Sequence, residues 1–267
     1  MSWLTRLLSP SRPPEDPSGD VAWLDVSGYE WVYAVGDVHG EYALMLQMEE
    51  LILRDWERLG RPSACTLYVG DVIDRGGKSA HILDHLTRRS RHKMDTHVLR
   101  GNHEQFMLDF IDDPKAHLDW LSFGGSETLA SYGIFETRSD FSRMRGRDIG
   151  ALLTASIPEG HTKFLRALPH AADAGRFLFC HAGVDPTKPL AAQGPEDFMW
   201  ARGRFMAHEG SLERVVVHGH TPVAGAAAVH HRVSIDTGAY STGTLSGCRV
   251  NLLRSDVEIL VAGGPEA

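Results

Sequence analysis

Five apolar segments of the sequence end in a residue that can bind a metal ion, and each of these residues lies beside a glycine or one residue away from one. The segments are 31–40 (WVYAVGDVHG), 65–76 (CTLYVGDVIDRG), 96–104 (THVLRGNHE), 176–183 (RFLFCHAG) and 214–222 (RVVVHGHTP). Together they supply six candidate ligands: Asp37, His39, Asp71, Asn102, His181 and His220. One such residue alone is better explained as a turn aspartate or a buried core histidine. The same break in five apolar runs favours a metal centre.

The donor types indicate which ions would bind. Oxygen and imidazole nitrogen donors without a thiolate suit Mn, Fe or Zn, and we expect Mn first. Two ions can share six side chains if one carboxylate bridges them. We assign Asp37, His39 and Asp71 to one ion, and Asp71, Asn102, His181 and His220 to the other. Two dications and two ligating carboxylates leave a charge of about +2, or about +1 with a bridging hydroxide, which attracts a phosphate dianion.

Composition limits the other classes of function. The chain has 267 residues, 42% of them hydrophobic, which is enough for one large domain. Its net charge of −8 argues against a broad basic surface for nucleic acid, so no nucleic-acid partner is expected. The cysteines Cys65, Cys180 and Cys248 are widely spaced, which predicts a reduced, cytoplasmic protein.

The N-terminal segment is expected to be a flexible tail, residues 1–20, before one domain over 21–267. Its short apolar stretch has no small-residue cleavage site, which argues against a secretory signal. Trp3, Leu4, Leu7 and Leu8 could touch a membrane, but a frayed terminus is the simpler interpretation. No apolar run reaches transmembrane length, so no stable membrane association is expected.

Strands and helices alternate in the first part of the chain, which predicts an α/β fold. Apolar residues at helical spacing predict helices over 41–60 and 78–89, and a third helix that begins near Asn102 with Phe106, Met107 and Phe110 on its apolar side. Residues 111–170 are expected to form a helical and loop-like lobe that contains FGGSETLASYG. After residue 176 the pattern is mostly strand, at 176–180, 214–218, 232–236, 247–253 and 257–261, and a second, more antiparallel sheet is expected. In open α/β sheets, side chains at the carboxyl ends of strands meet in one crevice, so the six ligands should converge there.

Taken in order, the motifs GDVHG, GDVIDRG, RGNHE, HAG and GHT resemble those of the PPP-type metallophosphatases, in particular the bacterial serine/threonine protein phosphatase branch. The resemblance covers roughly residues 30–260. It implies the calcineurin-like fold, with two mixed β-sheets sandwiched between helices. It also implies a two-metal centre that hydrolyses phosphomonoesters by in-line attack of a metal-bound hydroxide. The division of ligands given above is similar to that of the family, which makes His220 a ligand and His218 a packing residue.

The resemblance also implies roles beyond the ligands. His103 would be the general acid that protonates the leaving oxygen, with Asp74 orienting its ring. Arg75 would hold phosphate oxygens, as a planar guanidinium does well. The segment FMWARGRF is similar to a Trp-x-Arg segment of bacterial members, so Arg202 is the expected second clamp and Arg204 the less favoured one. Tyr240 faces the substrate or serves the structure. GGSETLASYG is expected on the substrate side of the lobe, and it is not a Walker loop because no Lys-Ser/Thr follows its glycines.

Three functions compete for this chain. The first is a protein phosphatase that acts on phosphoserine, phosphothreonine or phosphotyrosine. The second is a hydrolase of dinucleoside polyphosphates such as diadenosine tetraphosphate. Bacterial relatives with that activity typically replace the Asp of the DRG motif, whereas this chain keeps Asp74, so the sequence favours phosphomonoesters, in phosphoproteins or small molecules. The third is a non-catalytic metal-binding module, against which the presence of every ligand together with His103, Asp74 and Arg75 argues.

Overall fold

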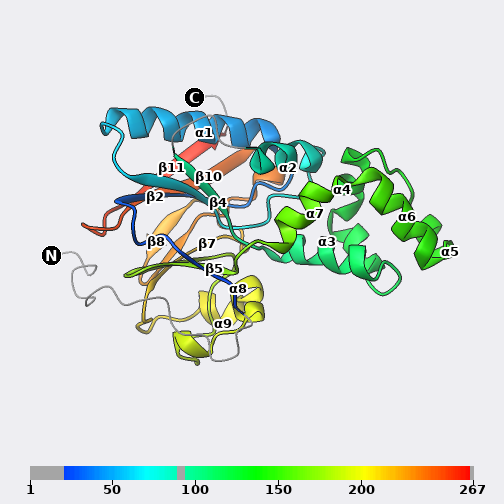
Figure 1. Ribbon diagram of the computed structural model, residues 1–267. Coiled ribbons are helices and arrows are strands. Elements are labelled where there is room, and N and C mark those ends of the chain that lie inside the picture. Colours follow the sequence, from blue (N-terminus) through cyan, green and yellow to red (C-terminus); the bar gives the residue numbers. More distant parts are fainter. Residues whose placement is uncertain (1–20, 89–93, 265–267) are drawn as a thin grey trace.

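The computed structural model describes residues 21–88 and 94–264, so the expected tail at 1–20 lies outside the described residues. Two mixed β-sheets lie face to face (Figure 1). The five-stranded sheet has the order β11 (Val257–Gly263), β10 (Thr244–Asn251), β2 (Trp31–Val35), β3 (Ala64–Tyr68), β4 (Asp95–Val98). The six-stranded sheet has the order β1 (Trp23–Asp25), β5 (Ala171–Ala174), β6 (Phe177–Cys180), β7 (Val215–His218), β9 (Arg232–Ser234), β8 (Ala227–Val229).

The strands alternate between two apolar layers, because successive side chains of a strand point to opposite faces. In β2, Val32 and Ala34 face the other sheet, whereas Tyr33 and Val35 face the helices. The core between the sheets also contains Leu67 of β3 and a row of six-stranded-sheet residues, Phe177, Phe179, Val215, Val217 and Val233. The predicted fold, two mixed sheets between helices, is confirmed.

Helices cover the outer faces of both sheets. α1 (Tyr42–Arg58) and α2 (Ser79–Thr87) share the outer core of the five-stranded sheet, with Met48 and Ile82 fully buried. α8 (Pro195–Trp200) and α9 (Gly203–Met206) pack against Leu178 and Val216 of the six-stranded sheet. The predicted helices at 41–60 and 78–89 correspond to α1 and α2. The third predicted helix is α3 (Asn102–Asp112), in which Met107 and Phe110 are buried but Phe106 is only half-buried.

The strands after residue 176 do not form a second, more antiparallel sheet, so that expectation is wrong. β6, β7 and β9 run parallel to one another, whereas β10 and β11 join β2 in the other sheet. Strand patterning shows that a segment is half-buried or buried, but it does not show which strand it pairs with. β1, β5 and β8 were not expected; β5 (AADA) and β8 (AAV) consist mostly of alanine, which gives little strand signal.

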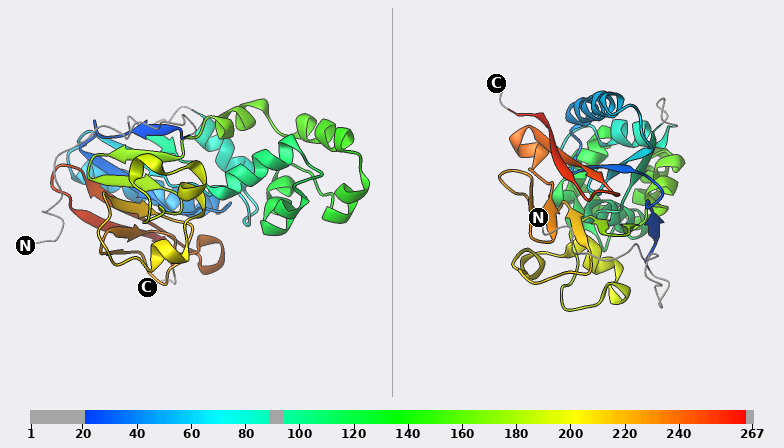
Figure 2. Two further views of the ribbon diagram at one scale, coloured as in Figure 1. Left: turned by 90° about the horizontal axis from the view of Figure 1, so that it is seen from below. Right: turned by 90° about the vertical axis from the view of Figure 1, so that its left-hand side faces the viewer.

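The segment between β4 and β5 is helical and extends to one side of the sheets (Figure 2). After α3 it contains η2 (Leu118–Phe123), α4 (Gly125–Ser131), α5 (Arg138–Arg143), α6 (Gly146–Ser156) and α7 (Glu159–Arg166). The ring of Phe110 lies 5.1 Å from Trp120 and 5.7 Å from Phe141, centroid to centroid. These rings form the core of the lobe. Two further short helices, η3 (Leu190–Ala192) and α10 (Ala239–Thr242), belong to connections of the sheets.

Two expectations about the whole chain can be compared with the structure. Among residues 21–88 and 94–264, no helix is both long and apolar enough to cross a membrane. Cys65, Cys180 and Cys248 are all buried and unpaired. Burial raises the pKa of the Cys65 thiol to about 12, so this sulfur is an inert part of the core.

Candidate metal centre

The six candidate ligands follow the carboxyl ends of five parallel strands. β2, β3 and β4 are parallel neighbours in one sheet, and β6 and β7 are parallel neighbours in the other. The two sheets touch at this edge, where a Cβ on Gly36 would lie 2.2 Å from the carbonyl oxygen of Ile235. All six candidate ligands are at most 8% exposed. The crevice predicted from the sequence therefore forms between two sheets rather than along one.

The glycines beside the ligands have a steric cause. A Cβ on Gly101 would lie 2.2 Å from Asp71 Oδ1, and one on Gly219 would lie 2.0 Å from Asp37 Oδ1. Any other residue would collide with a carboxylate of the centre. The recurring glycine of the sequence pattern thus makes room for the ligand of a neighbouring strand.

Several site residues hold a backbone conformation that favours glycine. Of the eight non-glycine residues with positive φ in the described part of the chain, five belong to the predicted site: His39 (45°), Asp71 (50°), Asp74 (71°), Arg75 (65°) and His220 (64°). Each such residue costs about 1–2 kcal/mol, and the strain persists only where surrounding contacts impose it. Such strain concentrates at functional sites, which agrees with a catalytic role for these loops.

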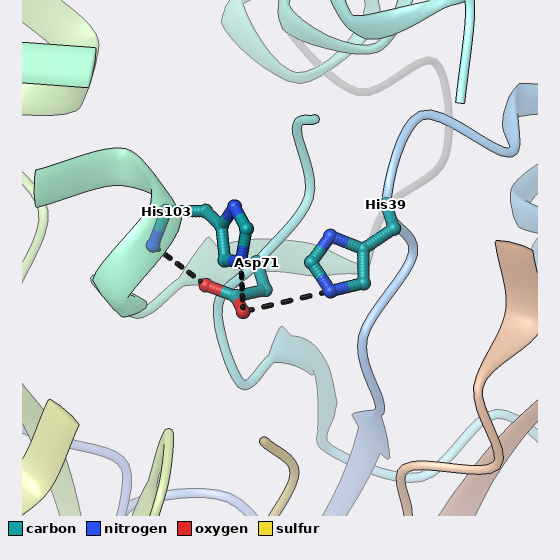
Figure 3. Close-up of side chains that lie close together, drawn as sticks. All are labelled: His39, Asp71 and His103. Carbon is teal, nitrogen blue, oxygen red and sulfur yellow. Dashed lines mark hydrogen bonds and ion pairs between the residues drawn. The ribbon is translucent and has the colours of Figure 1, made fainter. Parts of the chain in front are cut away.

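Asp71 lies at the centre of the first group of potential ligands, with His39 and His103 on either side (Figure 3). Its Oδ2 atom is 3.6 Å from Nε2 of His39 and 3.8 Å from Nε2 of His103, while Oδ1 accepts the backbone N–H of His103. Burial raises the pKa of Asp71, but the imidazoles around it, His181 first, outweigh burial and hold that pKa well below its usual range. Asp71 is therefore an ionised acceptor placed between imidazoles.

The hydrogen bonds of two histidines direct Nε2 of each ring at the centre. Nδ1 of His39 donates to the carbonyl of Ile73 (2.9 Å), and Nδ1 of His181 lies 3.2 Å from the carbonyl of Val69. A backbone carbonyl on the far nitrogen is the usual support of a metal-binding imidazole. Burial also lowers the pKa of His39 to about 3, which keeps the ring neutral.

Asp71, His181 and His220 form the second group of potential ligands. Nε2 of His181 lies 3.0 Å from Nδ1 of His220, 2.9 Å from Oδ1 of Asn102 and 3.3 Å from Oδ2 of Asp71. Nitrogens bound to a common ion at about 2.0–2.1 Å are about 3 Å apart, so this spacing fits a divalent cation. The structure thus brings together the four residues assigned to the second ion.

Asp37 is the predicted ligand whose surroundings differ most from the expectation. Its two carboxylate oxygens accept the backbone N–H of His220 at 3.0 and 3.2 Å, and it belongs to neither group of potential ligands. Burial, then the carboxylates of Asp236 and Asp71, raise its pKa well above its usual range. Several buried carboxylates so close together fit the presence of cations. The assignment of Asp37 to the first ion stays a prediction.

His103 and Asp74 are paired as the general-acid interpretation requires. Nδ1 of His103 donates to Oδ2 of Asp74 at 2.7 Å, and both side chains are buried. Burial lowers the pKa of His103, but the Asp71 carboxylate and the bond to Asp74 outweigh it and raise that pKa to about 9. The imidazole is therefore protonated at neutral pH, with Nε2–H directed toward the centre.

The helical lobe supplies the other partners of Asp74. The indole Nε1 of Trp120 donates to Oδ2 of Asp74 at 2.7 Å, and the Thr128 hydroxyl donates to Oδ1 at 2.6 Å. The backbone N–H of Asp74 bonds to Oγ1 of Thr128 as well (3.0 Å). GGSETLASYG thus contributes to the site by orienting Asp74 rather than by binding phosphate with its glycines.

The two candidate phosphate clamps lie at the two sides of the centre. Arg75 has its Nη2 3.3 Å from Nε2 of His103 and its guanidinium 4.5 Å from the centroid of the Tyr240 ring. Arg202 donates from Nε to Nε2 of His220 at 2.7 Å. Arg204 instead lies 3.7 Å from Asp185. Tyr240, 42% exposed and 5.4 Å from His39 between ring centroids, lies at the rim of the site.

A metal ion on His220 would change the contact of Arg202. When Nδ1 of His220 binds an ion, the proton of a neutral ring is on Nε2, which then cannot accept from Arg202. The Arg202 side chain is exposed and would have to turn away from His220, which frees it for a substrate.

Several residues of the site had not been identified from the sequence. Glu104 is fully buried, and its carboxylate accepts the backbone N–H groups of Gly101, Asp71 and Val72, each at 2.8 Å. Its place three residues after the N-cap glycine of α3 is the available signal.

Asp236 follows β9 and accepts from Gly238 N–H (2.8 Å), so it repeats the pattern of an apolar run that ends in a carboxylate. His218, by contrast, bonds to Gly219 and Ser234, as a packing residue does.

The sequence matches the profile of a family described as "Calcineurin-like phosphoesterase" over residues 31–263. Relatives named "Bis(5'-nucleosyl)-tetraphosphatase PrpE [asymmetrical]" occur in Bacillus cereus and in Bacillus thuringiensis strain Al Hakam. Each is 25% identical over 240 residues, which is 80% of this chain and 88% of the relative.

Solved structures with the same fold are similar over most of their length. One is titled "Crystal structure of a putative diadenosine tetraphosphatase", with a TM-score of 0.60, 19% identity and coverage of 91% of this chain and 98% of that one. Another is a cold-active protein-tyrosine phosphatase of a psychrophilic Shewanella species, with a TM-score of 0.52, 15% identity and coverage of 97% and 85%. At these identities the likeness concerns the fold alone.

Proposed function

The chain belongs to the calcineurin-like phosphoesterase family and is a phosphoester hydrolase, and we propose that it uses two divalent metal ions, Mn first, to hydrolyse dinucleoside polyphosphates such as diadenosine tetraphosphate. The proposal of two-metal hydrolysis rests on one observation: two groups of buried His and Asp side chains share Asp71. A shared carboxylate is the arrangement expected of a two-metal site.

The residues of this chain would divide the work as follows. When bound, divalent ions would supply an activated water and neutralise charge on the phosphoryl oxygens. His39, Asp71, Asn102, His181 and His220 would hold them, with Asp37 as the remaining predicted ligand. Arg75 and Arg202, at the two sides of the centre, would hold phosphate oxygens of the substrate. Nε2–H of His103 would donate a proton to the leaving oxygen, held in place by Asp74.

The choice of substrate reverses the preference drawn from the sequence. Retention of Asp74 had favoured phosphomonoesters, and phosphoproteins among them. The relatives that match 80% of the chain are named as tetraphosphatases, which supports a small dinucleotide instead. The Asp74–His103 pair is compatible with either, because a nucleotide phosphate leaves readily and a proton donor adds little to that step.

Hydrolysis of phosphomonoesters, including phosphoserine, phosphothreonine or phosphotyrosine in proteins, is the second candidate. The buried pair of His103 and Asp74, joined at 2.7 Å, favours it specifically. An alkoxide leaves poorly unless it is protonated, so a proton donor held in place by a carboxylate benefits this reaction most.

A direct comparison of substrates tests the proposal. Mn-loaded protein would be assayed with diadenosine tetraphosphate, a phosphoserine peptide and p-nitrophenyl phosphate, with kcat/KM measured for each. We expect the highest value for diadenosine tetraphosphate, and unequal products, AMP and ATP, as the word "asymmetrical" in the names of the relatives implies. A higher kcat/KM for the phosphoserine peptide would support the second candidate and overturn the first.

A further inference from the structure

Three aromatic rings lie together beside the metal centre and have no part in the chemistry described above. They are Phe106 of α3, Phe123 of η2 and Trp200 of α8, and we name this group the aromatic shelf. The ring centroids of Phe106 and Phe123 are 5.6 Å apart, with the rings stacked at 22°, and Trp200 meets Phe106 edge to face at 5.1 Å. The shelf is thus continuous, although its residues come from three separate parts of the chain.

The aromatic shelf adjoins the centre at both ends. The ring of Phe106 lies 6.1 Å from that of His103, the proposed proton donor. The indole of Trp200 lies 6.0 Å from the ring of His220, a predicted ligand. Phe123 immediately precedes Gly124, whose carbonyl accepts the backbone N–H of Arg75 at 3.4 Å. The guanidinium of Arg75 in turn contacts the ring of His103, with Nη2 3.3 Å from Nε2, so the proposed phosphate clamp and the aromatic shelf adjoin the same residue.

The exposure of the shelf differs from that of a core cluster. Phe123 is 50% exposed, and both Phe106 and Trp200 are only partly buried, so apolar ring surface faces the solvent beside a strongly polar site. Exposure alone does not identify a binding surface. Phe135 of the same lobe is 76% exposed, yet it makes no ring contact with any described residue. What distinguishes the shelf is its continuity with the catalytic groups.

We infer that the aromatic shelf stacks against a nucleobase of the substrate, with Phe123 as the outermost ring. The inference rests on the proposed function, since it assigns a place to the base of a dinucleoside polyphosphate. In such a molecule a flat, uncharged ring is joined through a ribose to a chain of anionic phosphates. That order, aromatic and then anionic, matches the order of the shelf and Arg75 along this face.

The chemistry of stacking also predicts the specificity. Every nucleobase has a π face, so stacking is strong without selecting one base. Phe106 and Phe123 have no side-chain donor or acceptor that could distinguish one base from another. We therefore expect adenine and guanine dinucleotides to bind with similar strength.

Replacement of Phe123 tests the inference with matched controls. The KM for diadenosine tetraphosphate and the inhibition constant of inorganic tripolyphosphate, which has no base, would be measured for the wild type, Phe123→Ala, Phe123→Tyr and Phe135→Ala. Loss of one base–aromatic stack corresponds to about 5- to 150-fold in KM. We expect Phe123→Ala to raise KM at least about fivefold and to leave the tripolyphosphate constant unchanged. Phe123→Tyr, which keeps the ring, and Phe135→Ala should both behave like the wild type.

The contrary outcomes are distinct. If the wild type hydrolyses diadenosine tetraphosphate and Phe123→Ala leaves KM unchanged, the shelf assignment is wrong and the proposed function stands. If KM and the tripolyphosphate constant rise together, Phe123 supports the phosphate site and not a base. If the wild type does not hydrolyse diadenosine tetraphosphate at all, the proposed function fails and the shelf assignment falls with it.

Discussion

Asp71 is the residue on which both groups of potential ligands depend, because its Oδ2 atom lies within 3.8 Å of three imidazole nitrogens. Asp71→Asn keeps the acceptor for the backbone N–H of His103 but removes the negative charge. We expect the metal content of the loaded protein to fall well below two ions per chain. His39→Ala should affect mainly one ion. Inductively coupled plasma mass spectrometry of desalted protein measures the metal content of both variants. An unchanged metal content in Asp71→Asn would show that the two ions do not share Asp71.

His103 is the residue whose role depends most on the leaving group. A general acid contributes about 10²–10⁴ in rate where the leaving oxygen needs a proton. His103→Asn should therefore lower kcat for a phosphoserine peptide by about that factor, and much less for p-nitrophenyl phosphate or diadenosine tetraphosphate. Asp74→Asn should show the same selectivity more weakly, since it orients the ring. Equal losses on all three substrates, at matched metal content, would mean that His103 acts through charge or position.

The same assays can test each of the two proposed phosphate-binding arginines, Arg75 and Arg202, separately. We expect Arg75→Ala or Arg202→Ala to raise KM and lower kcat while metal content stays intact. Arg204→Ala is the matched control, because Arg204 lies against Asp185 and not against His220. A crippled Arg204→Ala together with a normal Arg202→Ala would mean that the other arginine is the clamp.

At the scale of elements, the helical lobe orients a residue of the site through Trp120 of η2 and Thr128 of α4. Trp120→Phe preserves most of the ring volume and removes the indole N–H that bonds to Asp74. We expect Trp120→Phe to lower kcat for a phosphoserine peptide several-fold and to leave the metal content unchanged. This effect should be smaller than that of Asp74→Asn. Trp56→Phe is a matched control, since Trp56 lies in the last turn of α1 and its indole N–H bonds to the carbonyl of Pro62, which follows that helix. A loss equal in both variants would indicate a general loss of stability.

The attachment of β1 to β5 depends on an uncharged histidine. Nδ1 of His170 accepts the N–H of Ala22 at 3.0 Å, and the N–H of His170 bonds to the carbonyl of Ala22. Burial, and then Arg100, lower the pKa of His170 to about 4, below the unfolded value of about 6.5. The unfolded chain thus binds the proton more readily between these values, so stability is fully present above pH 6.5 and is lost as pH falls toward 4.

His170→Asn keeps an acceptor near the position of Nδ1 and removes the titrating group. We expect the wild type to lose about 1 kcal/mol more than the variant, in free energy of unfolding, between pH 7 and pH 5. Urea unfolding at both pH values measures this, with His81→Asn, an exposed substitution, as the control. The same pH dependence in His170→Asn as in the wild type would assign the acid sensitivity elsewhere.

At the scale of the whole molecule, what the sequence could predict was local. Each ligand breaks its own apolar run, so GDVHG or GNHE shows its candidate without reference to the rest of the chain. Contacts between distant segments were not predictable in that way. Trp120 and Thr128 reach Asp74 over 46 and 54 residues of sequence, and the rings of Phe106 and Trp200 meet between helices that follow strands of different sheets. The pairing of β10 with β2 is likewise a contact between distant segments, and the residue pattern of a single strand does not reveal its partner.

The arrangement of two sheets explains how a chain with net charge −8 could bind an anionic substrate. Both sheets deliver ligands to one edge, so the cations they would hold lie next to the phosphates, whereas distant surface acids are screened beyond roughly 10 Å. The central claim is therefore that two ions lie at this edge and share Asp71.

Crystals of the Mn-loaded protein, measured above the manganese absorption edge, test that claim most directly. We expect an anomalous difference map with two peaks that flank Asp71. One should lie at bonding distance from Asp37 and His39, and the other from Asn102, His181 and His220. A single peak, or a peak bound by Nε2 of His103 in place of Asp37, would contradict the account, because His103 could not then be the proton donor.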